Sequence, residues 1–197
     1  MLTFTLAVVF LVITPGPGVL SLAGVGAAFG YREGSRYMAG LFIGHNIVSL
    51  AVVTGLAAIM LAHDGLRTVL GLASAAYLLF LAYKIAFAGA RVAFIIRPAP
   101  PGLKGGALLQ VINPKAYAVN TAIFSNFAFM ADRPGLEIAI KWAIMLSIWL
   151  AAHVFWLWLG VTIRRLDLPE KTQRIINIIM ALAMLAVVAL AALAPQS

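Results

Sequence analysis

The sequence predicts an all-α integral membrane protein with a single transmembrane domain, residues 1–197. Hydrophobic residues make up 63% of the chain and charged residues only 10%, whereas a soluble domain has about 25% charged residues. The apolar residues lie in several long blocks separated by short charged connections, which neither a cleaved signal peptide nor a single anchor would produce. Nearly the whole chain is therefore expected in or beside the lipid bilayer.

Six stretches are long and apolar enough to cross the bilayer, because a helix needs about 20 apolar residues to do so. They are approximately 2–28, 38–62, 66–88, 106–130, 138–161 and 175–194. We therefore expect six transmembrane helices and no sizeable part outside the membrane. This leaves no room for a nucleotide-binding domain.

The distribution of basic residues predicts the orientation of the chain. A net charge of +8 could suit nucleic acid, but the basic residues are spread over the connections rather than gathered in one run, so no nucleic-acid partner is expected. Most of them lie in the first, third and fifth connections. By the positive-inside rule these connections face the cytoplasm, which places both termini outside. The chain has no cysteine, which excludes disulfides and thiol chemistry.

A short proline motif occurs once in each half of the chain, as VITP at 12–15 and VINP at 111–114. We predict repeat one at about 1–96, a linker RPAPPGLKGG at 97–106, and repeat two at about 107–197. Each repeat would contain three helices. An odd number of crossings inverts the second repeat relative to the first, an architecture common among secondary transporters.

Polar residues recur at matching positions of the two halves, Thr14 and Ser21 in the first and Asn113 and Asn120 in the second. Residues seven apart share one face of a helix. In the second half this face comprises Gln110, Asn113, Tyr117 and Asn120. It should point into the bundle, because lipid cannot satisfy amide groups.

The prolines predict interrupted helices. The sequence TPGPG at 14–18 places Pro15, Gly16 and Pro17 inside the first apolar segment, and proline removes a backbone donor and clashes with the preceding turn. Pro114 could likewise break the fourth segment, or begin a helix that Asn113 caps. Helix N-termini attract anions and freed carbonyls attract cations, so two facing breaks would suit a zwitterion.

Three segments resemble the LysE/RhtB family of amino-acid exporters. They are TPGPGVLSLAGVGAAFGYREGSRYMAGLFIGHN at 14–46, ASAAYLLFLAYK at 73–84 and VINPKAYAVNTAIFSNF at 111–127. The resemblance implies a multi-pass protein of the bacterial inner membrane that exports amino acids or related small zwitterionic metabolites, without a cofactor. Two features depart from the family pattern. Ser125-Asn126-Phe127 replaces a common Pro-Gln-Phe, and all six acidic residues lie in connections or at helix ends.

The motifs and the resemblance together give the candidate site. The predicted substrate-binding residues are Thr14, Pro15, Gly16, Pro17, His45, Asn113, Pro114, Lys115, Tyr117 and Asn120. His45 and His153 are also candidates for ion coupling, because ionisable residues inside a membrane are functional by default and histidine titrates near neutral pH. The alternatives are a packing kink at the prolines, an interface anchor at Lys115, and neutral histidines bonded to neighbouring helices.

The leading hypothesis is a secondary exporter that works by alternating access and is driven by an ion gradient, with protons as the candidate ion. The alternative is a metal-ion exporter or channel of the same architecture. Two histidines without cysteine or buried carboxylates provide few metal ligands, so no metal site is predicted. An enzyme is not expected, since Gly-x-Ser-x-Gly and His-Glu-x-x-His are both missing. Glycines at four-residue spacing permit close helix contact, which is compatible with a homodimer.

Overall fold

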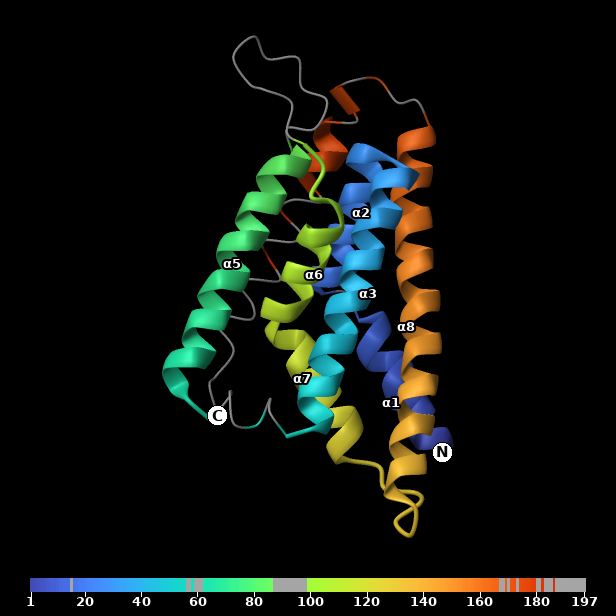
Figure 1. Cartoon of the computed structure of the whole chain (residues 1–197). Helices are drawn as coiled ribbons and strands as arrows, with labels where there is room; N and C mark the ends of the chain where they lie inside the picture. Colours follow the sequence, from blue (N-terminus) through green and yellow to red (C-terminus); the bar gives the residue numbers. More distant parts are fainter. Residues whose placement is uncertain are drawn as a thin grey trace.

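In the part of the chain that the computed structural model describes, all regular secondary structure is helical (Figure 1). That part comprises residues 1–14, 16–55, 58, 62–86, 99–166, 169, 171–172, 174–179, 182 and 186, without the side chains at 64, 67 and 71. The helices are α1 (Leu2–Ile13), α2 (Pro17–Phe29), α3 (Tyr31–Val53), α5 (Asp64–Ala86), α6 (Gly102–Ile112), α7 (Pro114–Ser125) and α8 (Pro134–Arg165).

The expected break in the first apolar segment is present. Helices α1 and α2 meet at an angle of 49°, and α2 begins with Pro17 at its first position, where the missing N–H costs no hydrogen bond. A second interruption separates α6 from α7 at Asn113, which has extended backbone angles. Pro15 and residues 97–98 of the predicted linker lie outside the described residues.

Two boundaries differ from the expected ones. Helix α3 begins at Tyr31 rather than near residue 38, because Gly30, with φ +84°, turns the chain within one residue. A polar first turn, with an Arg36–Glu33 ion pair of 2.9 Å, then precedes the apolar stretch. Helix α6 begins at Gly102, inside the predicted linker, where the small glycines of the linker let the helix approach its neighbour.

Helices α3, residues Thr68–Ala86 of α5, and α8 are each long and apolar enough to cross a membrane. The bent pair of α1 and α2 makes a fourth candidate span. The expected fourth crossing corresponds to α6 and α7, and most of the expected sixth, 175–194, lies outside the described residues. The count of six therefore remains a prediction.

The helices form an elongated bundle in which each half of the chain packs against the other (Figure 1). Helix α3 packs along α6, and α2 packs along α8. Helices α2 and α6 occupy one end of the bundle, while α1 and α7 occupy the other (Figure 1). The two breaks consequently lie at middle depth, facing the interior.

Glycines bring these paired helices into backbone contact. A Cβ on Gly160 of α8 would collide with the carbonyl oxygen of Ala23 in α2. On the other pair, a Cβ on Gly40 would collide with the carbonyl of Leu103, and one on Gly106 with that of Tyr37. Small residues permit such close approach in membrane bundles, so these interfaces have no room for larger side chains.

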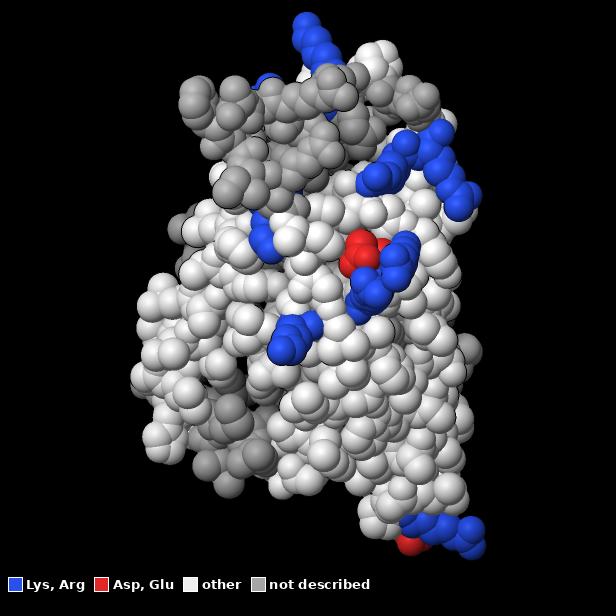
Figure 2. Space-filling model, turned by 45° about the horizontal axis from the view of Figure 1, so that its top comes forward, with Lys and Arg blue, Asp and Glu red and all other residues white. Residues whose placement is uncertain are grey.

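Basic residues gather at one end of the bundle, where α2 ends and α3 begins (Figure 2). That end carries Arg32 and Arg36 at the start of α3, Lys104 near the start of α6, and Arg164 and Arg165 at the end of α8. Nη1 of Arg164 donates to the carbonyl of Ala28 in the last turn of α2, where a cation also complements the helix dipole. The first residues of the chain lie at the opposite end (Figure 1).

A buried ion pair holds the connection between α7 and α8. Nζ of Lys141 lies 2.8 Å from Oε1 of Glu137 and donates to the carbonyl of Asn126 at 3.0 Å. The other oxygen of Glu137 accepts from the amides of Phe129 and Met130. This carboxylate therefore organises the connection.

We expect Gly160→Val to destabilise the bundle, because the new side chain must push α8 away from Ala23 of α2. Overpacking of this kind costs about 1–3 kcal/mol, which lowers the Tm by about 2–12 °C for a chain of this size. The measurement is thermal unfolding in detergent. Gly135→Val is the control on the same helix, because nothing lies within 4 Å of its Cβ position. Equal Tm values for the two variants would contradict the close packing of α2 and α8.

Candidate functional site

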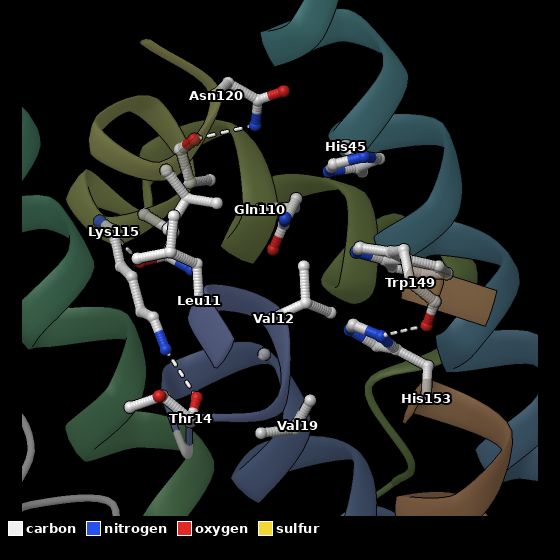
Figure 3. A pocket seen from close by; sticks show the side chains of 15 residues that line it. Leu11, Val12, Thr14, Val19, His45, Gln110, Lys115, Asn120, Trp149 and His153 are labelled. Atoms are coloured by element: carbon white, nitrogen blue, oxygen red, sulfur yellow. Dashed lines mark hydrogen bonds between the residues drawn. The ribbon is translucent and has the colours of Figure 1, made fainter. Parts of the chain in front are cut away.

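A cavity lies between the two helix breaks, in the middle of the bundle (Figure 3). Its free volume is about 60 Å³, which is room for about five water molecules. Its lining comes from α1, α2, α3, α6, α7 and α8, so both halves of the chain contribute. Part of the cavity lining is apolar and includes Leu11, Val12 and Val19.

The first break presents an open helix N-terminus to this cavity. Gly16 is the N-cap of α2, and no side chain caps the helix. The amide of Leu20 donates to the carbonyl of Gly16 at 3.1 Å, while the amide of Gly18 has no partner among the described residues. Gly16 and Gly18 both line the cavity. Such a terminus carries a partial positive charge.

The second break is capped by its own residues. The side chain of Asn113 accepts from the amide of Lys115 at 3.1 Å, and Pro114 supplies the first helical position without needing a partner. Both alternatives that the sequence left open are therefore realised together: the fourth apolar segment is interrupted, and its second part begins with an ordinary cap.

Lys115 connects the two breaks. Its Nζ donates to the carbonyl of Thr14, the residue that follows α1 (Figure 3). The Thr14 hydroxyl turns back instead and donates to the carbonyl of Phe10 at 2.6 Å. An ammonium group from the second half of the chain therefore satisfies a carbonyl freed by the break in the first half.

Three stacked rings form the opposite wall of the cavity (Figure 3). The Trp149 ring lies between His45 and His153, with centroids 5.3 Å and 3.5 Å away and interplanar angles of 22° and 16°. Nδ1 of His153 lies 2.8 Å from the carbonyl of Trp149. Because a carbonyl only accepts, Nδ1 carries the proton, which leaves Nε2 of a neutral His153 as an acceptor.

Two buried polar atoms at the cavity have no hydrogen-bond partner among the described residues. They are Oε1 of Gln110, in a residue 6% exposed, and Nε2 of His45, in a residue 3% exposed. Buried polar groups are nearly always paired, so such atoms require an explanation. The neighbouring Asn120 is satisfied, since it accepts from Ser49 at 2.6 Å and donates to the carbonyl of Ala116 at 2.7 Å.

The structure brings most of the predicted site residues together. Those that line the cavity are Thr14, Gly16, His45, Asn113, Lys115, Asn120 and His153. Pro17 and Pro114 are the first residues of α2 and α7 and act on the cavity by setting where those helices begin. Tyr117 does not line it but packs in a cluster with Val48 and Ala116. Pro15 lies outside the described residues.

Trp149 is a lining residue that the predicted site did not include, and Gln110 entered only as part of a polar face. The signal for Trp149 was its position one turn before His153, which places the two on one face of α8. For Gln110 it was the repeat of polar residues on one face. Among the described residues, no group of three or more His, Cys, Asp or Glu side chains could hold a metal ion.

Comparison with known proteins identifies the class. The family model described as LysE type translocator matches residues 9–194, so the chain belongs to this family of membrane transport proteins. It is 29% identical over 145 residues to a leucine efflux protein of Klebsiella pneumoniae, covering 71% of this chain and 68% of that protein. It is also 29% identical over 175 residues to a cysteine/O-acetylserine efflux protein of Salmonella typhi, covering 86% of each. No solved structure matches the chain significantly.

We expect Asn113→Ala to loosen the start of α7, because the amide of Lys115 loses its acceptor. Loss of an N-cap costs about 1 kcal/mol, or about 2–4 °C in Tm. Asn126→Ala is the matched control at the other end of α7, since its side chain bonds only within the helix, to the carbonyl of Ala122. A Tm for Asn113→Ala equal to that of the control would show that the cap adds nothing to stability.

Proposed function

We propose that this protein is a secondary transporter that exports amino acids or related small zwitterionic metabolites. Membership of the translocator family supports this proposal, as do the activities for which the relatives are named, efflux of leucine and of cysteine or O-acetylserine. The observation that carries it is the cavity itself, in which an open helix N-terminus, an ammonium group and the unpartnered acceptor Oε1 of Gln110 meet. A zwitterion is the kind of ligand whose two charges such groups can satisfy.

Two inverted three-helix repeats, at about 1–96 and 107–197, would provide alternating access to this cavity. The matching breaks before α2 and before α7 support the repeat, as does a histidine near the middle of both α3 and α8. The close glycine contacts of α2 with α8 and of α3 with α6 lie at the basic end. The corresponding pairs at the other end would be α1 with α8 and α3 with α7.

The helix pairs at the other end pack differently from those at the basic end. This difference supports a transport cycle in which the two ends exchange their kinds of packing. Helix α1 contacts the opposite half through Phe4 and Val8, which cluster with Ile123 and Met145. Side chains rather than backbone atoms therefore fill this end. We propose that transport alternates between a state closed by backbone contact at the basic end and one closed similarly at the other.

His45 and His153 are the proposed coupling residues. Both lie in the wall of the cavity, in contact with the same Trp149 ring. A histidine that gains a proton changes from acceptor to donor at Nε2, which would alter how the wall meets the ammonium group of a substrate. A proton gradient could then drive export without a nucleotide.

The proposed location is the bacterial inner membrane, with the basic end in the cytoplasm and both termini outside. The concentration of Arg and Lys at one end of the bundle supports this orientation. A homodimer remains a proposal that rests on the small-residue faces of the sequence alone. The described residues provide no observation that favours the alternative of a metal-ion exporter.

Proteoliposomes that contain the purified protein should release labelled leucine, cysteine or O-acetylserine faster than empty vesicles do. An imposed pH gradient should increase the rate. Gly18→Leu should abolish release, because a side chain at this position enters the cavity toward Gln110 and His153. Gly135→Leu is the control, since it faces open space. Release that Gly18→Leu leaves unchanged would remove this cavity from the transport path.

The coupling proposal predicts a selective effect of His153→Gln. This variant should lose stimulation by a pH gradient but keep exchange of labelled for unlabelled substrate across the vesicle membrane, because glutamine still offers an acceptor oxygen to the substrate and exchange needs no net proton movement. His63→Gln, outside the cavity, serves as the control. A His153→Gln protein with full pH stimulation would exclude this residue as the coupling group.

A further inference from the structure

We propose that the cavity holds its ligand in one orientation, with the carboxylate between Lys115 and the N-terminus of α2 and the ammonium group at Oε1 of Gln110 and Nε2 of His153. The inference rests on the proposed function and deepens it. It assigns the free carboxylate and the free amino group of the ligand to separate subsites of the cavity. It also makes Lys115 and Gln110 the residues that determine the specificity for these two groups.

The charge of the cavity favours an anionic group at one side. Lys115 lies in its wall, and no Asp or Glu is present among the described residues that line it. Lys115 is partly buried, and the partner of its ammonium group among the described residues is an uncharged carbonyl, that of Thr14. An ammonium group has three N–H donors. The carboxylate of a ligand can therefore supply the missing charge without breaking the bond to Thr14.

The N-terminus of α2 lies beside this ammonium group. A Cβ placed on Gly16, the N-cap, would be 3.0 Å from Nζ of Lys115. The two glycines flank a proline, so this terminus has no side chain with which to cap itself. The corresponding terminus of α7 is already capped by Asn113. Of the two helix starts at the cavity, the one before α2 is thus open to a carboxylate.

The acceptors lie beside Gly18, two residues further along the chain than Gly16. A Cβ placed on Gly18 would be 3.4 Å from Oε1 of Gln110 and 3.7 Å from Nε2 of His153. Oε1 is buried and has no partner among the described residues. An acceptor in this situation requires a donor, and an ammonium group supplies three. The hydrogen bond from Nδ1 of His153 to Trp149 keeps Nε2 available for the same purpose.

The two poles lie beside Gly16 and Gly18, two positions of one short segment. Gly16 adjoins the ammonium group of Lys115 and Gly18 adjoins the acceptor of Gln110, and the Cα atoms of residues two apart are separated by at most about 7 Å. A carboxylate and an amino group on one carbon, each with its hydrogen bond of about 2.8 Å, bridge a distance of this order. The aliphatic residues Leu11, Val12 and Val19 remain for the side chain of the ligand.

The first test compares ligands on the unmodified protein. Labelled leucine bound to purified protein is displaced with leucine, with leucinamide, which lacks the carboxylate, or with 4-methylpentanoate, which lacks the amino group. A charge-assisted hydrogen bond strengthens binding by about tenfold or more, so both analogues should compete at least tenfold more weakly than leucine. The same comparison uses cysteine and its amide if leucine does not bind.

Leucinamide that competes as well as leucine would overturn the inference and leave the export proposal standing. If neither leucine, cysteine nor O-acetylserine binds to folded protein, the export proposal fails and the inference fails with it. The two failures are therefore distinguishable in one experiment.

The second test assigns the two poles to residues. Lys115→Gln should lose the preference for leucine over leucinamide, and Lys115→Arg should retain it, while Gln110→Leu should lose the preference for leucine over 4-methylpentanoate. A preference is a ratio measured within one protein, so partial unfolding does not mimic its loss. Lys104→Gln is the matched control at the exposed start of α6. A Lys115→Gln protein that still prefers leucine tenfold would refute the carboxylate subsite.

Discussion

A polypeptide inside a membrane must satisfy its own backbone, because lipid provides neither donors nor acceptors. Every interruption of a helix at that depth therefore needs a protein-lined environment and specific partners. In this chain, one interruption follows α1 and another follows α6. Their mutual approach, with Lys115 on the Thr14 carbonyl, meets this requirement. The tight packing of α2 on α8 and of α3 on α6 holds the two interruptions together at the centre of the bundle.

The helices after the two interruptions each begin with a proline, Pro17 in α2 and Pro114 in α7, but the chemistry before these prolines differs. The second has an asparagine before its proline and closes itself, since Asn113 accepts from the following turn. The first has glycine on both sides of Pro17 and remains open. The two copies of the proline motif, VITP and VINP, therefore have different structural roles. The copy VINP begins α7, which carries Lys115, and the copy VITP contains Thr14, whose carbonyl accepts a hydrogen bond from this lysine.

The sequence predicted the features that depend on local chemistry. The positions of the prolines predicted the break before α2, and Asn113 with Pro114 predicted the start of α7. The repeat of Thr14 and Asn113 indicated that both breaks share one site. Features that depend on how helices rotate against each other were not predictable from one chain. Tyr117 follows the polar face in sequence, yet it packs against Val48, because α3 covers that side of α7. The contact of Trp149 with two histidines from different helices likewise arises only in the packed bundle.

The position of Trp149 has a practical consequence. Indole fluorescence responds to a stacked imidazole and is quenched when that imidazole becomes charged, and this indole is stacked on two imidazoles in the wall of the cavity. The chain therefore contains its own optical reporter at the point where ligand and proton would meet. With Trp142, Trp156 and Trp158 replaced by phenylalanine, the remaining tryptophan would allow occupancy and protonation to be followed in unlabelled protein, during turnover, in a native lipid bilayer.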